Sequence, residues 1–110
     1  MICEPWHVVV VPFPFSEAPG TKRRPALVVS RRSFNEGGHV VLAMITTKSK
    51  PSWQGDTWIE DRKTVGLDRR CLVRMKLFTI DSRLISRRIG RLGESDLERV
   101  KENLARCLAA

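Results

Sequence analysis

Short apolar runs, separated by clusters of proline, glycine and polar residues, make up most of the chain before its carboxyl end. These runs are rich in valine, isoleucine, leucine and threonine, a composition and length that predict β-strands. Four consecutive valines from Val8 to Val11 further predict a strand that is covered on both faces. The predicted strands are residues 7–11, 26–30, 39–46, 56–60, 71–78 and 84–92.

The carboxyl end changes to the period of a helix. Apolar residues recur three or four positions apart on one face, while Glu98 and Lys101 fall on another. Ser95 followed by Glu98 is typical of a capping box, and Gly93 is an alternative start for the helix. The predicted apolar face consists of Leu97, Val100, Leu104, Cys107 and Leu108.

The segment between the first two strands is different in kind. Residues 12–23 contain three prolines and Gly20, so they predict a long, mobile loop. About six strands, this loop and a terminal helix predict a mainly β fold with a C-terminal helix, curled into a small antiparallel barrel. At 110 residues without an internal repeat, the chain is expected to form one domain over residues 1–110.

The charge of the chain is strongly positive. Twenty lysines and arginines stand against twelve aspartates and glutamates, a formal net charge of +8. Such an excess favours a polyanionic partner, either nucleic acid or an acidic protein, over a surface that is merely solubilising. Charge alone does not indicate a reaction.

Other classes of protein are disfavoured by what the sequence lacks. Its longest apolar run is far short of the ~20 residues that span a bilayer, so no membrane association is expected. The amino terminus has no basic start followed by a long apolar stretch, and we therefore expect a cytoplasmic protein. Cys3, Cys71 and Cys107 are odd in number and far apart, a spacing that disfavours both a disulfide framework and a metal site. We expect no metal and no cofactor.

Few residues are available for acid-base or nucleophilic catalysis. Tyrosine is absent, and no motif for a nucleophilic serine or a phosphate-binding glycine loop is present. His7 and His39 could act as an acid and base pair, because imidazole titrates near neutral pH. Each also begins a predicted strand, and an ordinary role at a strand edge is the favoured interpretation.

The most informative cluster is Lys22-Arg23-Arg24-Pro25, where the loop meets the second strand. Proline restricts the residue before it to extended conformations, so Arg24 is expected on a stiff backbone. A planar guanidinium suits the negative charge that develops on a phosphodiester during cleavage. The alternative is a solvated basic end to the loop. Thr46 closes a predicted strand, where its hydroxyl could orient a phosphate oxygen or a 2′-hydroxyl.

A second group of cations lies in a later strand. Arg74 and Lys76 are two residues apart and are predicted to share one face, an arrangement that is costly in a core and natural along a phosphate track. Trp53 falls in a predicted loop and is the better candidate for stacking on a base. Trp58 lies in a predicted strand and is interpreted as packing.

Five blocks of the sequence, in the same order, resemble the MazF/PemK family of toxin-antitoxin ribonucleases. They are VVVVPFPFS, KRRPALVVS, LAMIT, VRMKLFTID and IGRL. The likeness extends from about Trp6 to the terminal helix. The chain departs from the family pattern in two places. His7 stands where an acidic residue is typical, and Arg69-Arg70-Cys71 replaces what is commonly a Pro-Ser segment.

The resemblance implies an SH3-like barrel, usually a homodimer, that acts as a sequence-specific endoribonuclease. Such an enzyme cuts single-stranded RNA, such as mRNA, at short sequences without metal and leaves a 2′,3′-cyclic phosphate and a 5′-hydroxyl. The resemblance also implies a cognate acidic antitoxin, and contact with operator DNA only through the complex with that antitoxin. By position, the catalytic residues of the family fall on Arg24 and Thr46. The residues implied to bind RNA are Lys22, Arg23, Arg74 and Lys76.

A second interpretation belongs to a different class of protein. A catalytically weak or inactive member could bind nucleic acid or an antitoxin through the same basic groove. His7 favours this interpretation, whereas the presence of both Arg24 and Thr46 favours the ribonuclease.

Overall fold

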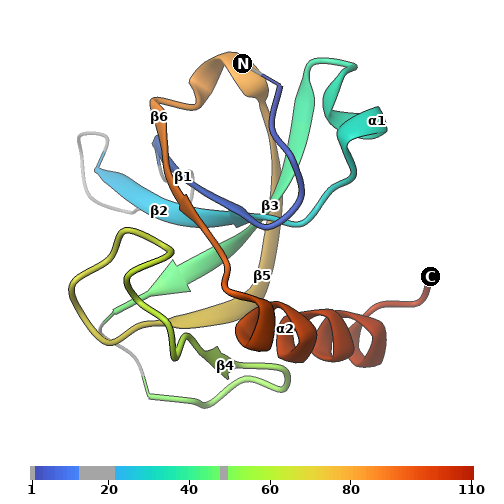
Figure 1. Cartoon of the computed structure of the whole chain (residues 1–110). Helices are drawn as coiled ribbons and strands as arrows, with labels where there is room; N and C mark the ends of the chain where they lie inside the picture. The colour runs from blue at the N-terminus through green and yellow to red at the C-terminus, as the bar shows by residue number, and fades with distance from the viewer. Residues whose placement is uncertain (1, 13–21, 48–49) are drawn as a thin grey trace.

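The computed structural model describes residues 2–12, 22–47 and 50–110. Within these residues, six strands form one antiparallel sheet in the order β4-β5-β3-β2-β1-β6 (Figure 1). The first three strands form a meander, which β5 extends on one side and β6 on the other. The elements are β1 (His7–Pro12), β2 (Arg23–Val28), α1 (Arg32–Asn35), β3 (His39–Thr46), β4 (Thr57–Trp58), β5 (Leu72–Asp81), η1 (Ser82–Leu84), β6 (Arg87–Arg91) and α2 (Glu94–Cys107).

The curled sheet buries apolar side chains on both of its faces. Val9 and Val11 pack into one core cluster, whereas Val8 packs into the other. The same alternation runs along β2, where Ala26 belongs to the first cluster and Leu27 to the second. The prediction that the valine run is covered on both faces is confirmed. Because alternate residues of a strand point to opposite faces, every position in the sheet can be assigned to one core.

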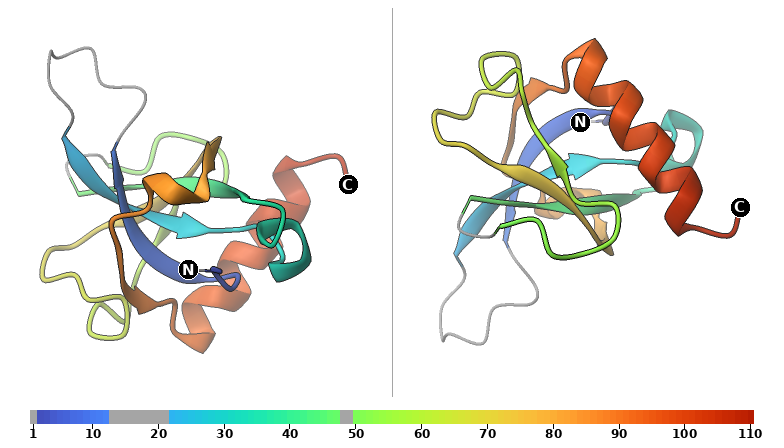
Figure 2. Two further views of the ribbon diagram at one scale, coloured as in Figure 1. Left: turned by 90° about the horizontal axis from the view of Figure 1, so that it is seen from above. Right: turned by 90° about the horizontal axis from the view of Figure 1, so that it is seen from below.

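Helix α2 covers the second core, and Figure 2 shows it running across one side of the curled sheet. Its buried residue Val100 joins that core. The helix begins after Gly93, the alternative start named above, and no side chain caps it. Asp96 is 1% exposed and accepts hydrogen bonds from the backbone N–H groups of Glu60 and Asp61, both at 3.0 Å. These bonds tie the helix to the segment that follows β4.

Several predicted boundaries are wrong, each for a local reason. Strand β2 begins at Arg23 rather than at residue 26, because β1 is long enough to pair with it as far as Pro12. The strand predicted over residues 84–92 begins only at Arg87. Residues Ser82–Leu84 instead form the short 3₁₀ helix η1, since the Asp81 carboxylate before it accepts a hydrogen bond from the N–H of Arg83 at 2.9 Å.

Helix α1 was not predicted, because it is a single turn that depends on distant contacts. Its Asn35 side chain donates to the backbone carbonyl of Cys3 at 2.8 Å and accepts from the Ser30 hydroxyl. The mainly β architecture with a C-terminal helix is nevertheless the predicted one. Among the described residues, no helix has both the length and the apolar character required to cross a membrane.

Candidate functional site

Arg24 and Thr46 lie at the same end of neighbouring strands. Strands β2 and β3 are antiparallel, with Ala26 opposite Met44. Two residues further along this register, Arg24 falls opposite Thr46, on the sheet face that carries Ala26 and Met44. Pro25 has no N–H to donate, so the paired part of the two strands begins after it. The fold therefore places Arg24 and Thr46 at the same end of two neighbouring strands, although they are far apart in the sequence.

The surroundings of these two side chains restrict their motion. Arg24 is half-buried and pairs with Val11 of β1, so its backbone belongs to the sheet rather than to a free loop. Thr46 is buried at the end of β3. Lys22 and Arg23 are exposed beside them. Most of the predicted mobile loop, residues 13–21, lies outside the described residues.

Arg74 and Lys76 come from β5, the other neighbour of β3. Arg74 lies opposite Met44, and Leu77 lies opposite the preceding residue of β3, so Lys76 falls in a bulge between these pairs. Met44 is two residues from Thr46, which places Arg74 on the sheet face of Thr46. Arg24, Thr46, Arg74 and Lys76 therefore share one face at one end of the sheet.

The Arg74 guanidinium is engaged within the protein itself. Its Nε and Nη2 donate to the two carboxylate oxygens of Asp56, at 3.1 and 2.8 Å. Nη2 also lies within hydrogen-bond distance of the Lys50 carbonyl and the Ser52 hydroxyl, at 3.3 and 3.2 Å. The side chains of Arg74 and Asp56 are only 9% and 1% exposed. The charge of Arg74 is therefore balanced by an internal carboxylate.

Asp56 is the partner that sequence reasoning missed. Burial raises the pKa of its carboxyl, but the hydrogen bonds from Arg74 and from the backbone N–H groups of Ser52 and Trp53 outweigh burial, and the net pKa is below its usual value. The carboxylate is thus ionised and opposes the Arg74 charge. The only local signal was an aspartate ending a polar turn that contains proline and glycine.

The two tryptophans near this turn differ in environment. Trp53 is 47% exposed, and the Arg74 guanidinium carbon lies 5.2 Å from the centroid of its ring. Trp58 is half-buried, and the guanidinium carbon of Arg70 lies 3.9 Å from its ring centroid. Trp58 thus has the packed environment that was expected, and base stacking by Trp53 stays a prediction.

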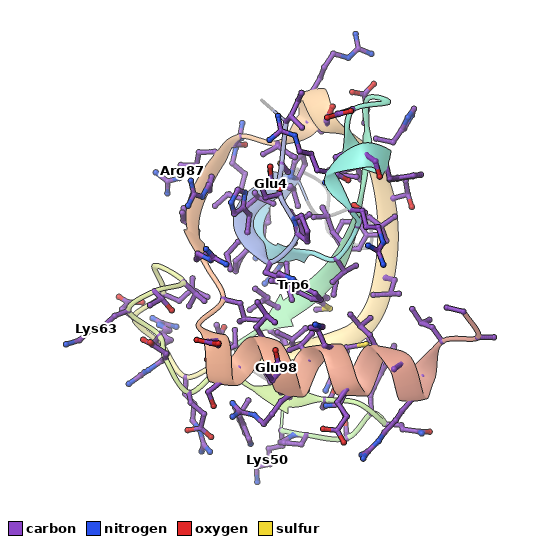
Figure 3. All side chains as sticks on the ribbon, turned by 45° about the vertical axis from the view of Figure 1, so that its right-hand side comes forward. Glu4, Trp6, Lys50, Lys63, Arg87 and Glu98 are labelled. Carbon is purple, nitrogen blue, oxygen red and sulfur yellow. The ribbon has the colours of Figure 1, made fainter. Side chains whose placement is uncertain are left out.

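A further arginine lies near Arg24. Arg23, Arg24 and Arg87 line a shallow hollow of about 500 Å³ together with apolar residues that include Val10 and Ile89. Figure 3 shows Arg87 pointing outward from β6. Arg87 lies opposite Val10 in the sheet, a long-range pairing that spacing along the chain does not reveal. Arg23 and Arg87 therefore add positive charge at this end of the sheet, on the face of Val10, which is opposite to the face of Val11 and Arg24.

The two histidines lie away from this end of the sheet. His7 begins β1 and His39 begins β3. Arg24 and Thr46 lie at the opposite end of the sheet, where β1 and β3 end. The Nδ1 of His7 accepts a hydrogen bond from the backbone N–H of Glu4 at 3.2 Å. Both histidines thus have the strand-edge positions favoured from the sequence. Among the described residues, no three His, Cys, Asp or Glu side chains form a cluster that could hold a metal ion.

Comparison with solved structures identifies the fold. An endoribonuclease from mycobacterial species, solved in complex with its cognate antitoxin, is 14% identical with a TM-score of 0.76, covering 94% of this chain and 92% of that chain. MazF from Deinococcus radiodurans is 18% identical with a TM-score of 0.74, and 96% of each chain is covered. The Mycobacterium tuberculosis toxin MazF-mt6 is 20% identical with a TM-score of 0.72, covering 91% and 93%.

Comparison of the sequence itself is more specific. No curated protein matches it closely. The model of the family described as the PemK-like, MazF-like toxin of type II toxin-antitoxin systems matches residues 4–108. This match spans nearly the whole chain, including both strands that carry Arg24 and Thr46. The chain therefore belongs to the PemK-like, MazF-like family of toxins of type II toxin-antitoxin systems.

Proposed function

We propose that this MazF-type toxin is an endoribonuclease that cuts single-stranded RNA without a metal ion. The 2′-hydroxyl of one nucleotide gives its proton to solvent as its oxygen attacks the adjacent phosphorus, and the bond from phosphorus to the 5′ oxygen of the next nucleotide breaks. The products are a 2′,3′-cyclic phosphate and a 5′-hydroxyl, which takes up a proton as it leaves. The observation that supports this proposal is the register of β2 and β3, in which Ala26 pairs with Met44, because its continuation by two residues puts Arg24 and Thr46 on one face at one end of the sheet.

Arg24 stabilises the charge that develops on the nonbridging phosphate oxygens. A planar guanidinium donates two parallel hydrogen bonds to such a group. Because Arg24 stays protonated at any ordinary pH, it acts through charge and hydrogen bonding and not as a general base. Its place on a paired strand means that little reorganisation is needed as the charge forms. The Thr46 hydroxyl orients the phosphate or the attacking 2′-hydroxyl.

The remaining cations hold the RNA strand. Lys22 and Arg23 are exposed beside Arg24, and Lys76 lies on the same sheet face, so these three supply contacts to neighbouring phosphates. Arg74, whose charge is balanced by Asp56, contributes by fixing the turn over residues 50–56. A mycobacterial endoribonuclease of the same fold was solved in complex with its cognate antitoxin. The partner proposed for this toxin is likewise a cognate antitoxin, whose acidic residues match the basic surface around Arg24. The active form is a homodimer, and it reaches operator DNA only within the complex with the antitoxin.

The experiment is cleavage of mixed-sequence single-stranded RNA in the presence of a chelator, with analysis of the product ends. The wild-type protein should give cyclic phosphate ends, and Arg24→Ala should cut at least about 100-fold more slowly, the scale of losing one transition-state donor. Arg31→Ala is the matched control, because Arg31 is also an arginine accessible at the surface but follows the far end of β2. Equal cutting by the wild type and Arg24→Ala would remove Arg24 from the mechanism. Binding without cleavage would favour the inactive binding module.

A further inference from the structure

The turn over residues 50–56 is held firmly against the sheet. The Asp56 carboxylate accepts hydrogen bonds from the backbone N–H groups of Ser52 and Trp53, at 2.9 and 3.0 Å. The same carboxylate binds Arg74 through two further hydrogen bonds. In return, the N–H of Asp56 donates to the Trp53 carbonyl at 3.1 Å. One buried carboxylate thus organises the backbone on which the Trp53 side chain is carried.

Close packing fixes the other side of this turn. Gly55 has a φ of +87°, and a Cβ at this position would lie 2.8 Å from the Cys107 sulfur of α2 and 2.9 Å from the Met75 side chain of β5. Only glycine meets both the conformation and the approach. The turn is therefore seated on the helix as well as on the sheet, and its shape is determined before any ligand binds.

The rigid turn presents a large aromatic surface. Trp53 is 47% exposed although its backbone is anchored. The Arg74 guanidinium lies over its ring at 5.2 Å from the centroid, a distance at which a cation is attracted to the ring. A tryptophan that served only to pack would be enclosed, as Trp58 partly is beneath Arg70. The structure instead holds the Trp53 ring in place while leaving about half of the residue accessible.

The position of this ring relates it to the candidate site. Arg74 lies opposite Met44, and Thr46 follows Met44 by two residues on the same face. A diagonal pair of this kind is separated by roughly 7–8 Å in a sheet. The turn over residues 50–56, which is hydrogen-bonded to Arg74, therefore lies near Thr46, at the end of the sheet where Arg24 also lies. A single-stranded nucleic acid with a phosphate at Arg24 and Thr46 would pass beside Trp53.

We propose that Trp53 is a stacking platform for one nucleobase of the bound single strand, next to the phosphate held by Arg24 and Thr46. Asp56 and Arg74 are positioning residues that act through the turn. This inference rests on the proposed function for the identity of the ligand. A flat ring beside cations is the arrangement by which proteins hold single-stranded nucleic acid with little dependence on base identity. Because Asp56 neutralises Arg74, the turn offers stacking rather than charge.

The test uses single-stranded DNA of mixed sequence, which lacks the 2′-hydroxyl and is not cut by the proposed reaction. Titration with this strand should quench the Trp53 fluorescence of the wild-type protein, and Trp53→Phe should lose that quenching. Trp53→Ala should bind about 5- to 100-fold more weakly, whereas Trp53→Phe should retain most of the affinity. The matched control is Phe34→Ala, because Phe34 is 49% exposed but lies on α1, beyond the far end of β2.

A second ligand distinguishes binding through base stacking from binding through phosphate charge. An oligomer of abasic deoxyribose phosphates should bind wild-type protein and Trp53→Ala equally, because it has phosphates and no bases. Equal affinity of these two proteins for the base-containing strand, with unchanged denaturation midpoints, would overturn the inference even if the wild type cleaves RNA. A change of oligomeric state in Trp53→Ala without loss of affinity would also overturn it and assign the ring to a protein contact. If single-stranded DNA quenches the Trp53 fluorescence of a wild-type protein that does not cut RNA, the stacking role of Trp53 is supported and the proposed function is rejected.

Discussion

Removing the Asp56 carboxylate should destabilise the whole fold, although Asp56 lies in a turn. The change Asp56→Ala takes away both oxygens that bind the Arg74 guanidinium, one of which, Oδ2, also accepts hydrogen bonds from two backbone N–H groups. Because the Arg74 side chain is only 9% exposed, its charge cannot recover full hydration without movement of the turn. The variant therefore leaves a largely buried cation without its counter-ion.

The size of the effect follows from this burial. Breaking a buried ion pair by removing one partner costs about 3–5 kcal/mol of the free energy of unfolding, a large share of the roughly 5–15 kcal/mol that stabilises a domain. The double variant Asp56→Ala with Arg74→Met removes the stranded charge as well. It should be less destabilised than the sum of its two single variants, because the two residues interact directly. Glu102→Ala, which breaks an exposed pair with Arg106, should have little effect.

The assay is urea denaturation followed by tryptophan fluorescence, at neutral and at acidic pH. The pKa of Asp56 is lower in the folded protein than its usual value, so its contribution is fully present above the unfolded pKa of about 4 and is lost as the pH falls through the folded pKa. The difference in stability between the wild type and Asp56→Ala should therefore shrink in acid. Two results would refute the conclusion that Asp56 and Arg74 form a stabilising buried ion pair. One is a loss in the free energy of unfolding of Asp56→Ala below about 1 kcal/mol at neutral pH. The other is a double variant whose loss equals the sum of the losses of its two single variants.

Two further predictions concern the strands. Gly90→Ala should lower the free energy of unfolding by about 1–3 kcal/mol, measured by the same denaturation, because the added Cβ would lie 2.3 Å from the Thr64 carbonyl oxygen; unchanged stability would contradict this tight approach. His7 should be neutral at pH 7, with its proton on Nε2, since burial and Arg88 lower its pKa and Nδ1 accepts from the Glu4 N–H. Its stabilising contribution should be complete above about pH 6.5 and lost as the pH falls through the folded pKa, and an imidazolium at pH 7 in nitrogen NMR spectra would contradict the assignment.

The sequence by itself determined the local elements and the chemistry that was available. Strand β3 has the predicted bounds, because its apolar run is ended by polar residues on both sides. The helical period of Leu97, Val100 and Leu104 likewise determined α2, since three such residues form one apolar face. The position of Arg24 before Pro25 also predicted a guanidinium on an extended backbone. Each of these conclusions depends on neighbours in the chain, which a linear pattern contains.

The tertiary structure alone decided which of these residues meet. Antiparallel pairing of Ala26 with Met44 places Arg24 and Thr46 at the same end of neighbouring strands, and it brings Arg87 beside that end of β2. It also gives Arg74 a buried partner in Asp56, so a cation that spacing assigned to a phosphate track is neutralised within the fold. A two-residue period assigns a side chain to a face, but it contains no information on which strand lies alongside. That choice is made by burial of the two cores, because only one order and register of the strands encloses both sets of apolar side chains.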